Sequence, residues 1–290
     1  MNLFEIFKKS FSTVITNPAV TLFLVLFMIA SNFLASYAFH INSYFVTLTL
    51  TGCIFLLSLC FISGWFEITK DLTLNKPEEN KNYWGIFLEG IGKNIIPIGL
   101  GCFIYVLILM CVLILTGKIC HEVFGSLDFI AKDASILTQD NASLIKYFET
   151  LTDNQKYILS AWQLSFIFST MVFGFIMLFY YPAIIFEKTN NNFLKPLIAL
   201  KDALIFTFKN FFGALFIHIF IYIIYMLFGI IRVNLGNNII ISILLIFFQI
   251  YFISFVVMLI FNYYEQRNNN SKRTDCIGKN ANIDKSCEEN

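Results

Sequence analysis

Six apolar stretches, each long enough to cross a bilayer as a helix, constrain the fold more than any other feature of the sequence. The hydrocarbon core of a membrane is about 30 Å thick, and a helix needs about 20 apolar residues to span it. None of the stretches carries Asp, Glu, Lys or Arg in its interior. We therefore predict an all-α polytopic membrane protein. Its predicted spans are 19–39, 44–66, 95–116, 158–181, 212–231 and 239–262.

The composition also fits a protein that is solvated by lipid. The chain is 58% hydrophobic and 13% charged, with a mean hydropathy of +0.72. Soluble domains are about 45–50% apolar and about 25% charged. The net charge is only +1, so no strong positive field marks a nucleic-acid-binding protein, and we predict no nucleic acid partner.

Lysines and arginines lie mostly on one side of the predicted spans. The N-terminal arm, the tail and the segments 67–94 and 187–210 hold 15 of the 20. Positive residues stay on the cytoplasmic side of a plasma membrane, so both termini are predicted to be cytoplasmic, with 117–157 as an outer loop. An integral membrane domain is predicted over 1–266, and a disordered cytoplasmic tail, poor in apolar residues, over 267–290.

The six spans form three predicted hairpins, and a segment with one apolar and one basic face precedes each of them. A helix of this kind lies in the headgroup plane, where its lysines meet anionic lipid. The alternative is that each segment extends the following span into the cytosol. The apolar faces consist of Phe4, Phe7, Phe11 and Val14, then Trp84, Phe87, Leu88 and Ile91, then Leu197, Leu200, Leu204 and Phe208.

These features together indicate an internal repeat. Each unit would consist of an amphipathic helix, an asparagine, two spans and an aromatic-rich exit that ends in glutamate. The middle unit would also contain the outer loop. The asparagines are Asn17, Asn94 and Asn210, and the exit glutamates are Glu67, Glu187 and Glu265.

Three polar side chains, Asn32, His218 and Gln249, lie near the middle of the spans. Neutral amides and imidazoles in this position usually hydrogen-bond between helices. The alternative is a polar pathway through the helix bundle of a transporter or channel subunit. His218 would be its most informative member, because histidine changes its charge near neutral pH.

The sequence predicts no catalytic, cofactor-binding or metal site. It contains no Ser/His/Asp order, HExxH, Walker loop or GxSxG motif, and its seven cysteines show no zinc-binding spacing. The exit glutamates lie close in sequence to Lys70, Lys188 and Arg267, which leaves acid–base chemistry on lipid headgroups as a remote alternative. A glutamate beside a basic residue at a helix end is more often a solvated charge.

The segment Tyr-Pro-Ala-Ile-Ile-Phe-Glu over 181–187, followed by the amphipathic segment 193–213, resembles a set of poorly characterised bacterial six-span inner-membrane proteins. That set includes the membrane domain attached to some glycerophosphodiester phosphodiesterases. In these proteins a span ends in proline, a few apolar residues and an acidic residue, which Pro182 and Glu187 match. The resemblance implies a six-span layout in a bacterial plasma membrane. It implies no activity, because these 290 residues contain no phosphodiesterase domain.

The function predicted from these features is that of a non-enzymatic scaffold, accessory or regulatory component of the cell envelope. Its expected partners are a bilayer with anionic headgroups and other membrane proteins or a second copy of itself, and no cofactor is expected.

Overall fold

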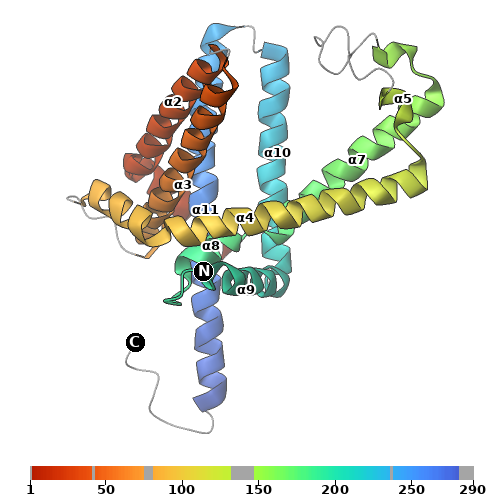
Figure 1. Cartoon of the computed structure of the whole chain (residues 1–290). Helices are drawn as coiled ribbons and strands as arrows, with labels where there is room; N and C mark the ends of the chain where they lie inside the picture. Colours follow the sequence, from red (N-terminus) through yellow and green to blue (C-terminus); the bar gives the residue numbers. More distant parts are fainter. Residues whose placement is uncertain (1, 41–42, 75–80, 132–146, 236–237, 281–290) are drawn as a thin grey trace. The chain divides into compact units, whose positions relative to one another are not determined.

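The computed structural model describes residues 2–40, 43–74, 81–131, 147–235 and 238–280 (Figure 1). These residues form helices and contain no strand. Six helices are long and apolar enough to cross a membrane, which confirms the prediction of an all-α polytopic protein.

The helices follow one another in a simple order along the chain. They are α1 (Leu3–Thr16), α2 (Pro18–His40), α3 (Tyr44–Leu74), α4 (Tyr83–Phe124), α5 (Asp128–Ala131), α7 (Asp153–Ile176), α8 (Tyr180–Phe186), α9 (Lys195–Lys209), α10 (Phe211–Leu235) and α11 (Ile239–Asn280). The chain divides into two compact units. The first comprises residues 1–101 and 177–290, and the second comprises residues 102–176.

The three amphipathic segments meet their spans in different ways. Helix α1 ends before Asn17, because the proline at position 18 disfavours helical backbone in the residue that precedes it. Helix α9 likewise ends before Asn210. The second segment instead forms the first part of α4, which continues through Pro97 without a break. For this segment the structure therefore has an extension of the span in place of a separate helix.

Helix α11 continues to Asn280, beyond the membrane-domain boundary predicted at residue 266. Once a helix is nucleated, each further residue adds a backbone hydrogen bond at little cost, so an apolar helix readily continues into polar sequence. The last part of the predicted tail, 281–290, lies outside the described residues.

Helices α2 and α3 form an antiparallel hairpin within the first unit. The rings of Phe27 and Phe61 stack with centroids 4.2 Å apart, and the Trp65 indole donates a hydrogen bond of 2.9 Å to the Val20 carbonyl oxygen. Phe61 and Trp65 are buried and Phe27 is half-buried. A stacked aromatic pair of this kind adds about 1 kcal/mol beyond the area it buries. The first of the predicted hairpins is thus present.

Helices α10 and α11 form another hairpin of the first unit, and α1 packs against them. Phe7 of α1 contacts Phe220 of α10 at 5.1 Å and Phe255 of α11 at 5.9 Å between ring centroids. Closer to the end of α11, the Ser10 hydroxyl accepts a hydrogen bond of 3.0 Å from the Asn262 amide. The N-terminal amphipathic helix is therefore fixed to the last span.

The exits of three helices meet in the first unit. The Phe261 ring of α11 contacts Phe66 of α3 at 5.3 Å and Phe186 of α8 at 5.9 Å. Helix α9 packs on α8, where the Phe179 and Phe206 rings make an edge contact at 4.8 Å. This aromatic layer brings the residues that follow each exit close together.

The second unit consists of the last part of α4 with α5 and α7. Thr116 donates a hydrogen bond of 2.8 Å to Ser169, and the Trp162 indole donates one of 3.2 Å to the carbonyl oxygen of Gly125, whose φ is +96°. A capping box precedes α7, since Thr152 and Gln155 exchange hydrogen bonds. Residues 132–146 of the predicted outer loop lie outside the described residues.

Candidate functional site

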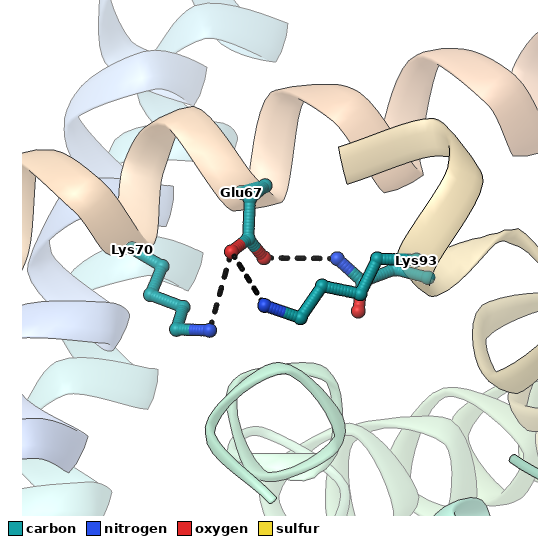
Figure 2. Close-up of polar contacts among 4 residues, drawn as sticks. Glu67, Lys70 and Lys93 are labelled. Carbon is teal, nitrogen blue, oxygen red and sulfur yellow. Dashed lines mark hydrogen bonds and ion pairs between the residues drawn. The ribbon is translucent and has the colours of Figure 1, made fainter. Parts of the chain in front are cut away.

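The Glu67 carboxylate is the centre of the most developed polar cluster in the first unit. Although Glu67 lies at the exit of a span, it is only 9% exposed. Its Oε2 atom accepts a hydrogen bond of 2.9 Å from the Asn94 amide, and its Oε1 atom pairs with Lys70 Nζ at 3.3 Å and with Lys93 Nζ at 3.6 Å (Figure 2). The expectation of a solvated helix-end charge is therefore wrong for Glu67.

Two glycines allow the helices that carry this cluster to approach one another. A Cβ atom on Gly90 of α4 would lie 2.6 Å from Glu67 Cβ and 3.0 Å from the Ser63 carbonyl oxygen on α3. Gly64 of α3 is covered in the same way by the Phe87 ring, 2.5 Å from the position of a Cβ. The absence of side chains at these positions places Lys93 and Asn94 directly over Glu67.

Asn94 is fully buried, and its two amide atoms have different environments. The nitrogen donates to Glu67, whereas Oδ1 has no hydrogen-bond partner within the described residues. A buried acceptor without a donor usually marks a position for water or for a bound group. The cluster thus has an unused acceptor beside its carboxylate.

Lys195 begins α9 close to this cluster and is only 5% exposed. Burial lowers the pKa of its ammonium group below the ordinary lysine value, and the positive charges of Lys70 and Lys93 lower it further. The carboxylates of Glu67 and Glu187 act in the opposite direction. Within the described residues its side chain has neither a hydrogen bond nor an ion pair, which is unusual for a buried lysine.

A cleft of about 790 Å³ opens beside Lys195 in the first unit. Its walls are formed by side chains from the ends of α3 and α8, from residues 265–269 of α11, from the first part of α4, and from the turn before α9. The lining residues are Lys70, Leu74, Lys93, Ile185, Phe186, Glu187, Lys188, Thr189, Asn190, Asn192, Lys195, Glu265, Asn268 and Asn269. We call this cavity the exit cleft.

The two residues of the family-like motif have different surroundings. Pro182 is buried within α8, and Glu187 caps the end of that helix and lines the exit cleft. The Glu187 carboxylate accepts hydrogen bonds from the backbone N–H and the hydroxyl of Thr189. The Glu265 carboxylate, on the same cleft, accepts one from the Asn269 amide. Neutral donors therefore already occupy part of the hydrogen-bonding capacity of these two carboxylates.

The polar residues predicted inside the spans do not line the exit cleft. Asn32 is exposed on α2, and its amide donates to the Met28 carbonyl oxygen of its own helix. His218 of α10 is buried with its ring 4.8 Å from that of Tyr222, and Gln249 of α11 is half-buried. A pathway built from Asn32, His218 and Gln249 stays a hypothesis.

Lys93, Asn94 and Lys195 were not predicted as site residues from the sequence. The sequence did mark Asn94 and Glu67, because Asn94 is one of the repeat asparagines and Glu67 is one of the exit glutamates. For Lys195 no signal existed, since its burial depends on how α8 and α9 pack.

Among the described residues, no group of three or more His, Cys, Asp or Glu side chains is placed to hold a metal ion. Comparison of the chain with models of known families, with curated proteins and with solved structures finds no match in any of the three.

Proposed function

We propose that this chain is a multi-pass plasma-membrane protein that acts as a non-enzymatic scaffold or accessory component on the anionic, cytoplasmic leaflet. The observation that carries the proposal is the pairing of exposed apolar stripes with lysines on the amphipathic segments, beside a lysine-lined cleft where the spans end. Its relation to the bacterial six-span inner-membrane proteins is part of the proposal and rests on Pro182 and Glu187.

The amphipathic segments present the surface that an interfacial helix needs. On α1, Phe4 is 75% exposed beside the exposed Lys8. On α9, Phe208 is 62% exposed and Lys201 is exposed as well. Aromatic side chains of this kind insert below the headgroups, while lysines attract anionic lipid with about 1 kcal/mol each. These contacts support a protein that organises the leaflet around it.

The repeat is also part of this proposal, and two contacts support it. The Phe87 ring covers Gly64, and Ser10 bonds to Asn262. Phe87 and Ser10 each lie seven residues before the repeat asparagine, while Gly64 and Asn262 each lie three residues before the exit glutamate. The same two positions of the repeat are therefore in contact in both cases. In each case an amphipathic helix packs on the exit of another repeat.

The third repeat interface has the same pairing of elements. The corresponding residues are Ala203 of α9 and Ile184 of α8, which are both fully buried on helices that pack together. In this arrangement the first part of α4 packs on the exit of the first repeat. Helix α9 packs on the exit of the second repeat, and α1 packs on the exit of the third repeat.

The proposed orientation predicts which lysine positions are reachable from outside the cell. In a variant without native cysteines, Lys156→Cys is expected to react with a membrane-impermeant thiol reagent in intact cells, and Lys201→Cys to react only after the cells are opened. Both positions carry exposed or half-exposed side chains, so the membrane decides the difference. The measurement is the labelled fraction on a gel.

The reverse labelling pattern would refute the cytoplasmic assignment.

A second measurement tests the scaffold role itself. The protein, extracted with its native lipids in a mild detergent, is expected to retain anionic lipids in preference to phosphatidylcholine. Equal retention of both classes would contradict the proposal.

A further inference from the structure

We propose that the exit cleft is a binding site for a phosphate group, held by Lys195 together with Lys70 and Lys93. This inference deepens the proposed function, on which it rests, by giving the leaflet contact a defined site and a ligand chemistry. A lipid headgroup and a soluble phosphate both present this group, and titration with each of them distinguishes the two sources.

The lysine side chains around the Glu67 carboxylate carry more positive charge than this carboxylate can balance. Lys70 and Lys93 share a single oxygen of Glu67, at 3.3 and 3.6 Å, so two ammonium groups face one carboxylate. Lys195 adds a further positive charge, and the other carboxylates of the cleft, Glu187 and Glu265, accept hydrogen bonds from neutral donors. A bound anion would complete this arrangement.

The surroundings of Lys195 are a separate argument for a bound anion. A lysine that is 5% exposed needs a partner for its charge, yet within the described residues it has neither a hydrogen bond nor an ion pair. It lines the cleft and stands at the N-terminal end of α9, where the helix dipole also favours an anion. The chain thus keeps a buried cation beside an open cleft.

The walls of the cleft favour phosphate over a simple carboxylate. Lysine is a compact point charge that commonly binds phosphate. The cleft lies where α3 and α8 end, beside residues 265–269 of α11. Basic pockets at the ends of membrane spans bind phosphorylated headgroups. Leu74, Ile185 and Phe186 add apolar surface that fits the glycerol and first acyl carbons of a lipid.

Phosphate binding at this site has a definite pH dependence. A bound anion favours protonated Lys195, whose pKa in the free protein is lowered. Affinity is therefore expected to be full below that pKa and to fall as the pH rises through it. A phosphate group does not lose negative charge as the pH rises, so a decrease in affinity reports on the lysine. Lys195→Arg is expected to keep its affinity at the same alkaline pH, because arginine stays charged.

The test uses the full chain in a neutral detergent, titrated with short-chain phosphatidic acid, with inorganic phosphate and with short-chain phosphatidylcholine as a control. The variants are Lys195→Gln, Lys195→Arg and, as a matched control on the exposed side of the same helix, Lys201→Gln. Wild type and Lys201→Gln are expected to bind phosphatidic acid more tightly than phosphatidylcholine. Lys195→Gln should bind it about tenfold or more weakly, and Lys195→Arg should restore binding.

Binding of phosphatidic acid alone identifies a lipid headgroup, and saturable binding of inorganic phosphate as well identifies the phosphate group itself as sufficient. Unchanged affinity in Lys195→Gln, with its folding verified by gel filtration, would overturn the site. If that variant also keeps its retained anionic lipids, the scaffold proposal stands without this site. Wild type that retains no anionic lipid over phosphatidylcholine contradicts the scaffold proposal instead.

Discussion

Gly90→Val is expected to destabilise the protein by about 2–3 kcal/mol. Gly92→Val, two residues further along α4, is expected to be neutral or slightly stabilising. A Cβ on Gly90 would lie 2.6 Å from Glu67 Cβ and 3.0 Å from the Ser63 carbonyl oxygen, and the latter belongs to a helix backbone that cannot rotate away. A Cβ on Gly92 meets nothing within 4 Å. The same substitution on the same helix thus separates close packing from helix propensity.

The measurement is unfolding in a mild detergent, followed by tryptophan fluorescence. Trp65 and Trp84 lie near the interface of α3 with the first part of α4, so the signal reports on the affected contact. Equal stability of the two variants would contradict the close packing of Gly90 against Ser63 and Glu67 of α3. A loss in both variants would attribute the effect to valine in the helix and leave the packing argument without support.

The class of fold was predictable because a bilayer imposes one length on every span. Five of the six apolar stretches lie within single helices of that length, whereas the fourth, 158–181, runs from α7 through a turn at 177–179 into α8. The helix ends were less predictable, since α4 joins the amphipathic segment to its span and passes through Pro97, whereas α1 stops before Pro18. A proline inside a membrane helix is tolerated when neighbouring groups satisfy the backbone, which no local pattern reveals.

The candidate site was predictable only in part, because its members are distant in sequence. Glu67 and Asn94 are 27 residues apart, and they meet because Gly90 removes the side chain that would separate α3 from α4. A glutamate at a helix exit usually remains in water, and only tertiary packing shows that this one is buried. Lys195 is a stronger example, since the pattern of α9 alone gives no reason to bury its first residue.

Substitution of Glu67 is expected to lower stability and to raise phosphate affinity at the same time. Glu67→Gln preserves the shape and can still accept the Asn94 hydrogen bond, but it leaves Lys70, Lys93 and Lys195 without their shared counter-charge. Removing one partner of a buried ion pair costs about 3–5 kcal/mol, and because Lys93 is half-exposed we expect about 2 kcal/mol. The matched control is Glu89→Gln, an exposed carboxylate on α4, for which little change is expected.

The opposite directions of the two effects make this prediction informative. A residue that only holds the fold together weakens binding when it is lost, because the site loosens with the fold. Glu67 instead competes with the ligand for Lys70 and Lys93, so its removal should strengthen phosphatidic acid binding severalfold in the same preparation that unfolds more easily. Unfolding in detergent and titration with phosphatidic acid measure the two effects separately. Weaker binding in Glu67→Gln would show that the carboxylate positions the lysines, and a phosphate would then not replace it as their counter-charge.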